Sequence, residues 1–182
     1  MHSPTEASMR MILALLFLMS AALSAAEKVQ PFHRPLLEFA PQLIDASGAK
    51  VDARYLLKTK YIILYFSASW CGPCHKYTPK LVEWYEKERD PKQVEVILVG
   101  SDQDTASMKA YMKDMKMPWP AFEMKGKAFE DIKKKYGGPG IPSTALLNEQ
   151  DEILANSFKD GKYQGPHVAI DALRDLLGAA AK

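Results

Sequence analysis

Cysteine and histidine are scarce in this chain of 182 residues, which has two cysteines, Cys71 and Cys74, and four histidines. Two cysteines allow at most one internal disulfide, so a scaffold held by several disulfides is excluded. A structural zinc site takes four nitrogen or sulfur ligands. The histidines are scattered and provide no second half-site at ligand spacing. We therefore expect no bound metal.

A strong excess of charge of one sign is also lacking. The chain has 24 Lys and Arg against 22 Asp and Glu, for a net charge of +2. This balance leaves too little excess positive charge to indicate nucleic-acid binding, and we expect no nucleic-acid partner. Internal repeats and low-complexity tracts are absent too. With 47% hydrophobic and 25% charged residues, the composition is that of a globular protein.

One long uncharged run is present, from Met11 to Ala26, directly after Arg10. Its 16 residues fall short of the ~20 that a membrane-spanning helix prefers. A positive residue, an apolar run and small residues at Ser24 and Ala26 are typical of a secretory signal peptide. We expect cleavage after Ala26, with an uncleaved membrane anchor as the alternative.

The predicted organisation is a signal peptide (1–26), an N-terminal extension (27–42) and one domain (43–182). The protein would then be exported, to a periplasm or outside the cell, where disulfides persist. A bond between Cys71 and Cys74 would close a very short loop and add little stability, because loop-closure entropy grows with loop length. This cysteine pair is better suited to chemistry than to stapling the fold.

Strand and helix patterns alternate along the domain. Runs of apolar β-forming residues predict buried strands at 61–66 and 94–100. Apolar residues at helical spacing predict a helix that begins at the cysteines and runs through Pro79. The other expected elements are two short strands within 43–51, a short helix at 53–58 capped by Asp52, helices beginning at Asp104 and Gly126, a hairpin of 143–148 with 152–157, and a last helix over about 166–178. This order indicates a three-layer α/β domain.

Cys71 is expected where a central strand ends and a helix begins, which is the edge where open α/β sheets bind ligands. A helix N-terminus carries partial positive charge and free N–H groups. Both lower a thiol pKa, from ~8.5 to near 7 or below. Cys71 would then be a nucleophilic thiolate near neutral pH, with Cys74 one turn further along the helix.

The segment WCGPC at 70–74 resembles the thioredoxin superfamily. Pro79 lies five residues past the second cysteine, and GIPST at 140–144 resembles the cis-proline segment of that family. The runs YFSASWCGPCHKYTPKLVEWYEK and DMKMPWPAF are similar to the nucleoredoxin and tryparedoxin branch. The resemblance implies a three-layer thioredoxin-like fold, with a central mixed β-sheet flanked by helices.

The resemblance also implies the roles of the site residues. Cys71 would attack a disulfide and Cys74 would resolve the mixed disulfide. Trp70 would shield the site, Pro142 would lie beside the sulfurs, and the Ile141 backbone would pair with a bound substrate strand. The residues expected to shape the site are Trp70, Gly72, Pro73, Ile141 and Pro142.

Two positions depart from thioredoxins proper. Tyr65 stands where thioredoxins have a buried aspartate, and Leu98 where they have its lysine partner. Because tyrosine has a pKa near 10, it is a poor base at neutral pH. Asp102, just after the second strand, is the candidate for proton transfer with Cys74; a loop or helix-capping role is the alternative.

Other interpretations of Cys71–Cys74–His75 remain open at this stage. C-x-x-C-H is also the attachment signature for c-type haem, although we expect His75 to face solvent and no haem to be bound. The domain could also be a non-catalytic binding module, or an oxidase or isomerase. We expect a monomeric thiol–disulfide oxidoreductase without cofactor, which reduces protein disulfides and draws electrons from a membrane or soluble thiol donor.

Overall fold

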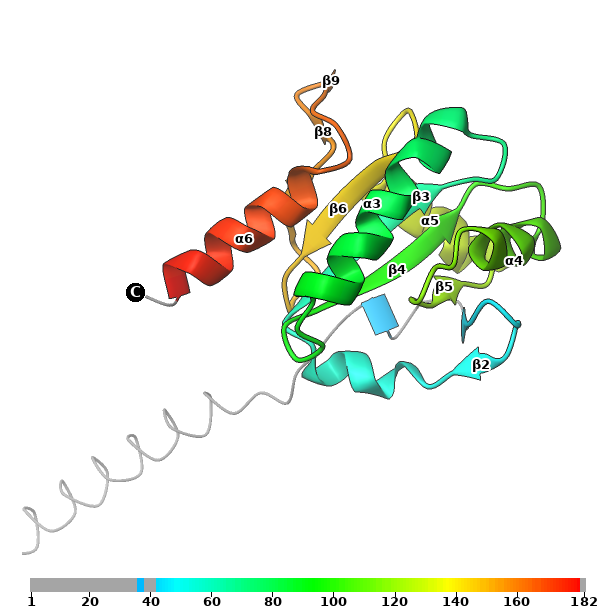
Figure 1. Cartoon of the computed structure of the whole chain (residues 1–182), viewed down its shortest axis with the longest axis horizontal. Helices are drawn as coiled ribbons and strands as arrows, with labels where there is room; N and C mark the ends of the chain where they lie inside the picture. Colours follow the sequence, from blue (N-terminus) through cyan, green and yellow to red (C-terminus); the bar gives the residue numbers. More distant parts are fainter. Residues whose placement is uncertain (1–35, 38–41, 181–182) are drawn as a thin grey trace, which may run out of the picture. The chain divides into compact units, whose positions relative to one another are not determined.

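A mixed β-sheet of seven strands forms the centre of the computed structural model, which describes residues 36–37 and 42–180 (Figure 1). The strand order is β2-β1-β5-β4-β3-β6-β7. Strand β3 pairs parallel with β4 and antiparallel with β6. The strands are β1 (Leu43–Ile44), β2 (Lys50–Val51), β3 (Tyr61–Ser67), β4 (Val94–Gly100), β5 (Ala121–Phe122), β6 (Ser143–Leu147) and β7 (Ile153–Asn156).

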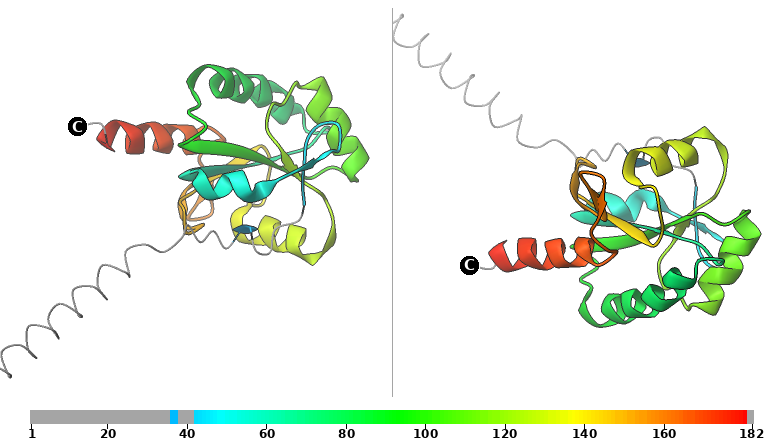
Figure 2. Two further views of the ribbon diagram at one scale, coloured as in Figure 1. Left: turned by 90° about the horizontal axis from the view of Figure 1, so that it is seen from below. Right: turned by 90° about the horizontal axis from the view of Figure 1, so that it is seen from above.

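Helices cover both faces of this sheet, and Figure 2 shows α3 and α5 on opposite sides of it. The helices are η1 (Ala53–Lys58), α3 (Gly72–Glu88), α4 (Thr105–Asp114), α5 (Gly126–Tyr136) and α6 (Val168–Ala180). The side chains of Asp52 and Asp104 cap η1 and α4 by accepting backbone N–H bonds, as aspartate does at helix N-termini. The predicted three-layer α/β architecture is confirmed.

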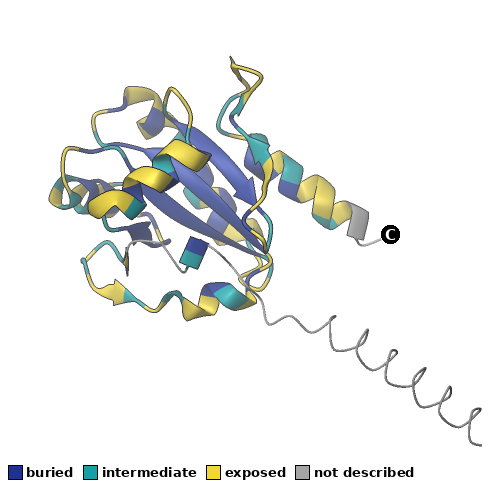
Figure 3. Ribbon diagram, turned by 180° about the vertical axis from the view of Figure 1, so that it is seen from behind, coloured by how far each residue is buried: buried dark blue, intermediate teal, exposed yellow. Residues whose placement is uncertain are grey.

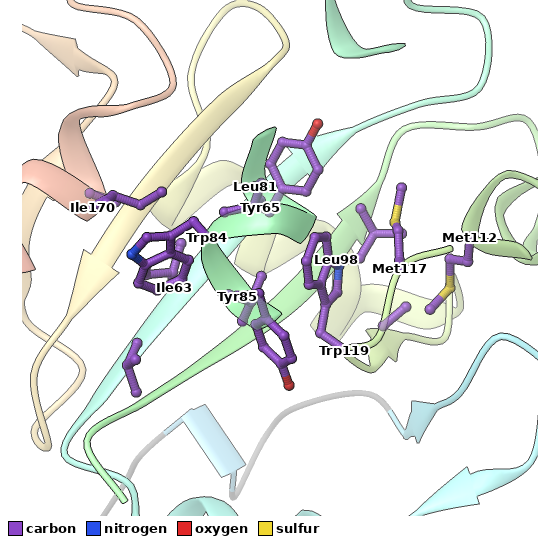
Figure 4. Close-up of a cluster of buried hydrophobic side chains, with 14 of the residues drawn as sticks. Ile63, Tyr65, Leu81, Trp84, Tyr85, Leu98, Met112, Met117, Trp119 and Ile170 are labelled. Carbon is purple, nitrogen blue, oxygen red and sulfur yellow. The ribbon is translucent and has the colours of Figure 1, made fainter. Parts of the chain in front are cut away.

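The central strand β3 supplies both cores, because successive side chains of a strand point to opposite faces. Tyr61, Ile63 and Tyr65 pack in the cluster that includes α3, α4 and α6, part of which is drawn in Figure 4. The alternate residues of β3 pack in the second cluster, with α5. All seven residues of β3 and all seven of β4 are buried, and Figure 3 shows the sheet as the buried layer.

Three short strands were not predicted from the sequence. Strand β5 joins β1 to β4, and β8 (Phe158–Lys159) pairs with β9 (Lys162–Tyr163) in a separate hairpin. Each has two residues, too few for the alternation that marks a strand in sequence.

The helix that was predicted to begin at the cysteines begins at Gly72 in the structure, and Cys71 is its N-terminal capping residue.

The predicted signal peptide, 1–26, lies outside the described residues, as does most of the extension at 27–42. Within the part that the structure describes, no helix is long and apolar enough to cross a membrane.

Candidate active site

Cys71 and Cys74 form a disulfide at the start of α3, with sulfurs 2.03 Å apart. Cys71 caps the helix, and the backbone N–H of Cys74 donates to Cys71 Sγ at 3.2 Å. The chain reaches this cap from the end of β3 through three residues, 68–70. The helix N-terminus is thus directed at the sulfur of Cys71, where its partial positive charge stabilises a thiolate.

The two sulfurs differ in access. Cys71 keeps 4% of its surface exposed and Cys74 keeps none. Cys74 is buried with Ala68 and Cys71, and Ile141 packs against this cluster. An incoming sulfur can therefore approach Cys71 and not Cys74.

The segment that precedes β6 lies against the disulfide, as the sequence predicts. The Ile141–Pro142 peptide bond is cis, and the Ile141 carbonyl oxygen is 3.7 Å from Cys71 Sγ. Pro142 is buried and Ile141 is half-buried. The cis-proline segment and the cysteine cap therefore come together, although they are about 70 residues apart in the chain.

Trp70, Gly72 and Pro73 surround the disulfide on its solvent side. Trp70 is 68% exposed, and its indole Nε1–H donates to the Ser101 carbonyl oxygen at 3.0 Å. Gly72 and Pro73 form the exposed first turn of α3. Trp70 therefore borders the site over the end of β4.

Beneath Cys74 lies a network of four buried hydroxyl groups. Thr78 Oγ1 donates to the Cys74 carbonyl oxygen at 2.8 Å. The same oxygen lies 2.8 Å from the Tyr65 hydroxyl and 2.9 Å from the Tyr111 hydroxyl. The Tyr111 hydroxyl is also 2.9 Å from Ser67 Oγ. Tyr65 thus fills the place of the thioredoxin aspartate with a neutral group, and burial raises the pKa of this tyrosine.

The protons of this network can be placed without any charged group. Because the Thr78 proton goes to the Cys74 carbonyl, Thr78 accepts from both Tyr65 and Tyr111. Ser67 then donates to Tyr111, which has no other proton to give. Every hydroxyl proton is used, as buried polar groups require. Sequence analysis singled out Tyr65 and none of its three partners.

Asp102 lies in the loop after β4 with 8% of its surface exposed. Its Oδ1 accepts the Ser69 backbone N–H at 2.8 Å, while Oδ2 has no hydrogen-bond partner among the described residues. No hydrogen bond joins Asp102 to either cysteine within the same residues. Its observed contact holds the segment that leads into the cysteine cap, and the next helix is capped by Asp104 instead.

His75 is exposed, as expected, and is also held in place. Its Nε2 lies 2.6 Å from the Ser69 carbonyl oxygen, and its ring centre lies 5.2 Å from that of Tyr111. Tyr163, which the sequence did not single out, donates its hydroxyl to the Pro142 carbonyl oxygen at 2.6 Å. The β8–β9 hairpin is thereby attached to the cis-proline segment.

Among the described residues, no three His, Cys, Asp or Glu side chains gather closely enough to hold a metal ion.

The comparisons with known proteins agree with this geometry. A family model described as thioredoxin-like matches residues 59–153, just over half of the chain. Tryparedoxin from Trypanosoma brucei brucei is 38% identical over 110 residues, which are 60% of this chain and 74% of that protein. Nucleoredoxin from Xenopus laevis is 36% identical over 145 residues, 79% of this chain and 32% of that protein.

A solved structure of tryparedoxin from Trypanosoma brucei has a TM-score of 0.57 at 32% identity, and covers 66% of this chain and 85% of that one. The chain spans about a third of the nucleoredoxin that it matches. Together, the matched sequence, the fold and the cysteine pair favour dithiol chemistry over haem attachment. The chain belongs to the thioredoxin-like family of thiol–disulfide oxidoreductases.

Proposed function

We propose that this protein is an exported reductase of protein disulfides. The observation that carries the proposal is the unequal access of two bonded sulfurs, since Cys71 keeps 4% of its surface exposed and Cys74 keeps none. This arrangement suits a dithiol in which one sulfur meets the substrate and the other completes the exchange.

In the reduced protein, the Cys71 thiolate attacks one sulfur of a substrate disulfide. A bond forms between Cys71 and that sulfur, and the other substrate sulfur leaves as a thiolate and takes a proton. The Cys74 thiolate then attacks Cys71, which restores the Cys71–Cys74 disulfide and releases the second substrate thiol. Two electrons pass from the protein to the substrate, and a membrane or soluble thiol donor must return them.

The surroundings supply three groups for these steps. The Cys74 N–H, 3.2 Å from Cys71 Sγ, stabilises negative charge on that sulfur. The Ile141 backbone lies beside the same sulfur and would pair with an extended substrate strand. Asp102, buried near the cysteine cap, would exchange a proton with Cys74 through an intervening water.

Export is part of the proposal and rests on the sequence of residues 1–26. Expression in a host with a secretory pathway should yield a protein whose measured mass is that of a chain beginning at Glu27. An unprocessed protein that stays with the membrane fraction would favour the anchored alternative.

The direction of electron flow is tested by the reduction potential, measured in graded thiol–disulfide buffers with alkylation to count thiols. A value near −270 mV supports a reductase, whereas one well above −180 mV identifies an oxidant or isomerase.

Insulin reduction provides the activity assay, with Cys71→Ser and Cys74→Ser as controls. Cys74→Ser should accumulate a mixed disulfide on Cys71. Full activity in Cys71→Ser would reject the mechanism, whereas an unmodified protein that does not reduce insulin would favour a binding module.

A further inference from the structure

A groove of about 450 Å³ runs beside the disulfide, between α3 and the β8–β9 hairpin. We name it the α3–hairpin groove. Its volume lies within the roughly 300–1,000 Å³ of ligand sites. It is bordered by the α3 stripe Pro73, Lys76, Tyr77 and Lys80, by the cis-proline segment at 140–142, and by Phe158, Tyr163 and Pro166.

The helical side of the groove follows one face of α3, because residues three and four apart lie on the same face. Pro73 stands next to the cysteines. The midpoint between Lys76 and Lys80 lies seven residues beyond Cys71, the sulfur that would hold the substrate, ~10.5 Å along the helix at 1.5 Å per residue. A substrate chain that leaves the disulfide in extended form covers that distance in about three residues.

The groove carries positive charge from two lysines of α3. Lys76 and Lys80 are both exposed, and no acidic side chain is among the lining residues. Elsewhere on α3, Lys87 is paired with Glu83 at 2.7 Å. No ion pair is formed by Lys76 or Lys80 in the part of the chain that the structure describes. Two cations at the edge of an apolar groove attract an anionic ligand.

The opposite wall is apolar and fixed. The rings of Phe158 and Tyr163 lie 5.1 Å apart, and the Tyr163 hydroxyl is bonded to the Pro142 carbonyl. On the α3 side, the Tyr77 hydroxyl donates to the Pro166 carbonyl oxygen at 2.8 Å. The hairpin lies beyond residues 59–153, the part that matches the family model.

We propose that the α3–hairpin groove selects protein substrates in which an acidic residue lies about three positions from the reactive cysteine, with apolar residues between them. The inference rests on the proposed function, since the groove opens beside Cys71. The apolar residues would contact Phe158 and Tyr163, and the carboxylate would lie between Lys76 and Lys80.

The test uses three peptides joined as disulfide dimers, equal in length and with apolar residues around the cysteine. They carry Glu, Gln or Lys at the third position on both sides. The rate at which the reduced protein reacts with each is followed by tryptophan fluorescence. Each rate is divided by that of the same peptide with dithiothreitol, a neutral dithiol, which removes differences in intrinsic reactivity.

We expect the Glu peptide to react about tenfold faster than the Lys peptide at low ionic strength, and the ratio to approach one at ~1 M salt. The double variant Lys76→Glu/Lys80→Glu should reverse the preference, and Lys76→Gln/Lys80→Gln should abolish it. Lys50→Glu/Lys134→Glu makes the same change in net charge on β2 and α5, and should leave the ratio as it is.

Equal rates for the three peptides in the unmodified protein would overturn the inference while leaving the reductase proposal intact. A ratio that shifts equally in both charge-reversed variants would also overturn it, because the preference would then follow net charge and not the groove. If no peptide reacts, the proposed function itself fails, and this inference with it.

Discussion

The Thr78 hydroxyl donates to the Cys74 carbonyl oxygen at 2.8 Å, which links the buried cysteine to the hydroxyl network beneath the sheet edge. Thr78 is the branch point of that network, because it also accepts from Tyr65 and Tyr111. The carboxylate found there in thioredoxins is thus replaced by groups that stay neutral, and the network adds no negative charge beside Cys74.

Thr78→Val keeps the shape of the side chain and removes this branch point. Two buried tyrosine hydroxyls then lose their acceptor, and an unsatisfied buried polar group costs about 1–3 kcal/mol. We expect the free energy of unfolding, measured in urea, to fall by about that amount. Thr78→Ser, which keeps the hydroxyl, should lose less. If Thr78→Val unfolds at the same urea concentration as the unmodified protein, the network does not stabilise the fold.

Tyr65 should make the protein sensitive to alkali. Its pKa is raised by burial in the folded state, whereas it is near 10 in the unfolded chain. Below pH ~10 both states hold the proton. Above that pH the unfolded chain releases it and the folded protein does not, so stability falls as the pH rises.

Tyr65→Phe removes one such proton. The slope of unfolding free energy against pH, measured above pH ~10, should become shallower by about 1.4 kcal/mol per pH unit. A slope should remain, because burial also raises the pKa of Tyr77 and Tyr85. Tyr77→Phe should reduce the slope in the same way. An unchanged slope in Tyr65→Phe would mean that this hydroxyl ionises in the folded protein.

Trp70 should report the redox state of the disulfide. It adjoins Cys71 and is 68% exposed, while Trp84 and Trp119 are 7% and 1% exposed. We expect the change in fluorescence on reduction to disappear in Trp70→Phe and to persist in Trp84→Phe. The lost bond to Ser101 is at an exposed position and should cost at most about 1 kcal/mol. A redox-dependent signal that survives in Trp70→Phe would assign it to a buried tryptophan.

Sequence patterns predicted the scaffold of the site well. The buried runs of β3 and β4 and the cysteines between strand and helix follow from local periodicity, and the cis-proline followed from resemblance. The network partners were missed because they come from distant elements: Thr78 and Tyr111 are 33 residues apart. Only the folded chain brings a threonine of α3 and a tyrosine of α4 to the same point.

The groove wall was missed for a different reason. Phe158 and Tyr163 sit in two-residue strands joined by Asp160 and Gly161, both with positive φ. A turn of this kind is a hairpin signal, but the strands on either side are too short to display alternation. From sequence alone, Lys76 and Lys80 would ordinarily be interpreted as part of the solvent-exposed face of a helix. Their relation to the disulfide appears once the first turns of α3 and the hairpin are seen at the same end of the sheet (Figure 1).

Variants of Asp102 can distinguish the two roles that sequence analysis left open for it, proton transfer with Cys74 and a structural role in its loop. Its Oδ1 holds the Ser69 N–H, and its buried Oδ2 is without a partner among the described residues. Asp102→Asn keeps an acceptor for Ser69 and removes the group that can carry a proton. Asp102→Ala removes both, and should destabilise the fold by about 1–3 kcal/mol.

We expect Asp102→Asn to fold as stably as the unmodified protein and to release a mixed disulfide from Cys71 at least about tenfold more slowly near neutral pH. The reason is that a positioned general base speeds proton removal, here from Cys74, by roughly 10²–10⁴-fold when that step limits the rate. The rate of this release is measured as a function of pH, starting from Cys71 joined to a thiol label by a mixed disulfide. The unmodified protein, Asp102→Asn and Asp102→Ala are compared. If Asp102→Asn matches the unmodified protein across the profile while Asp102→Ala is slow and unstable, Asp102 acts only by holding Ser69, and Cys74 exchanges its proton with water directly.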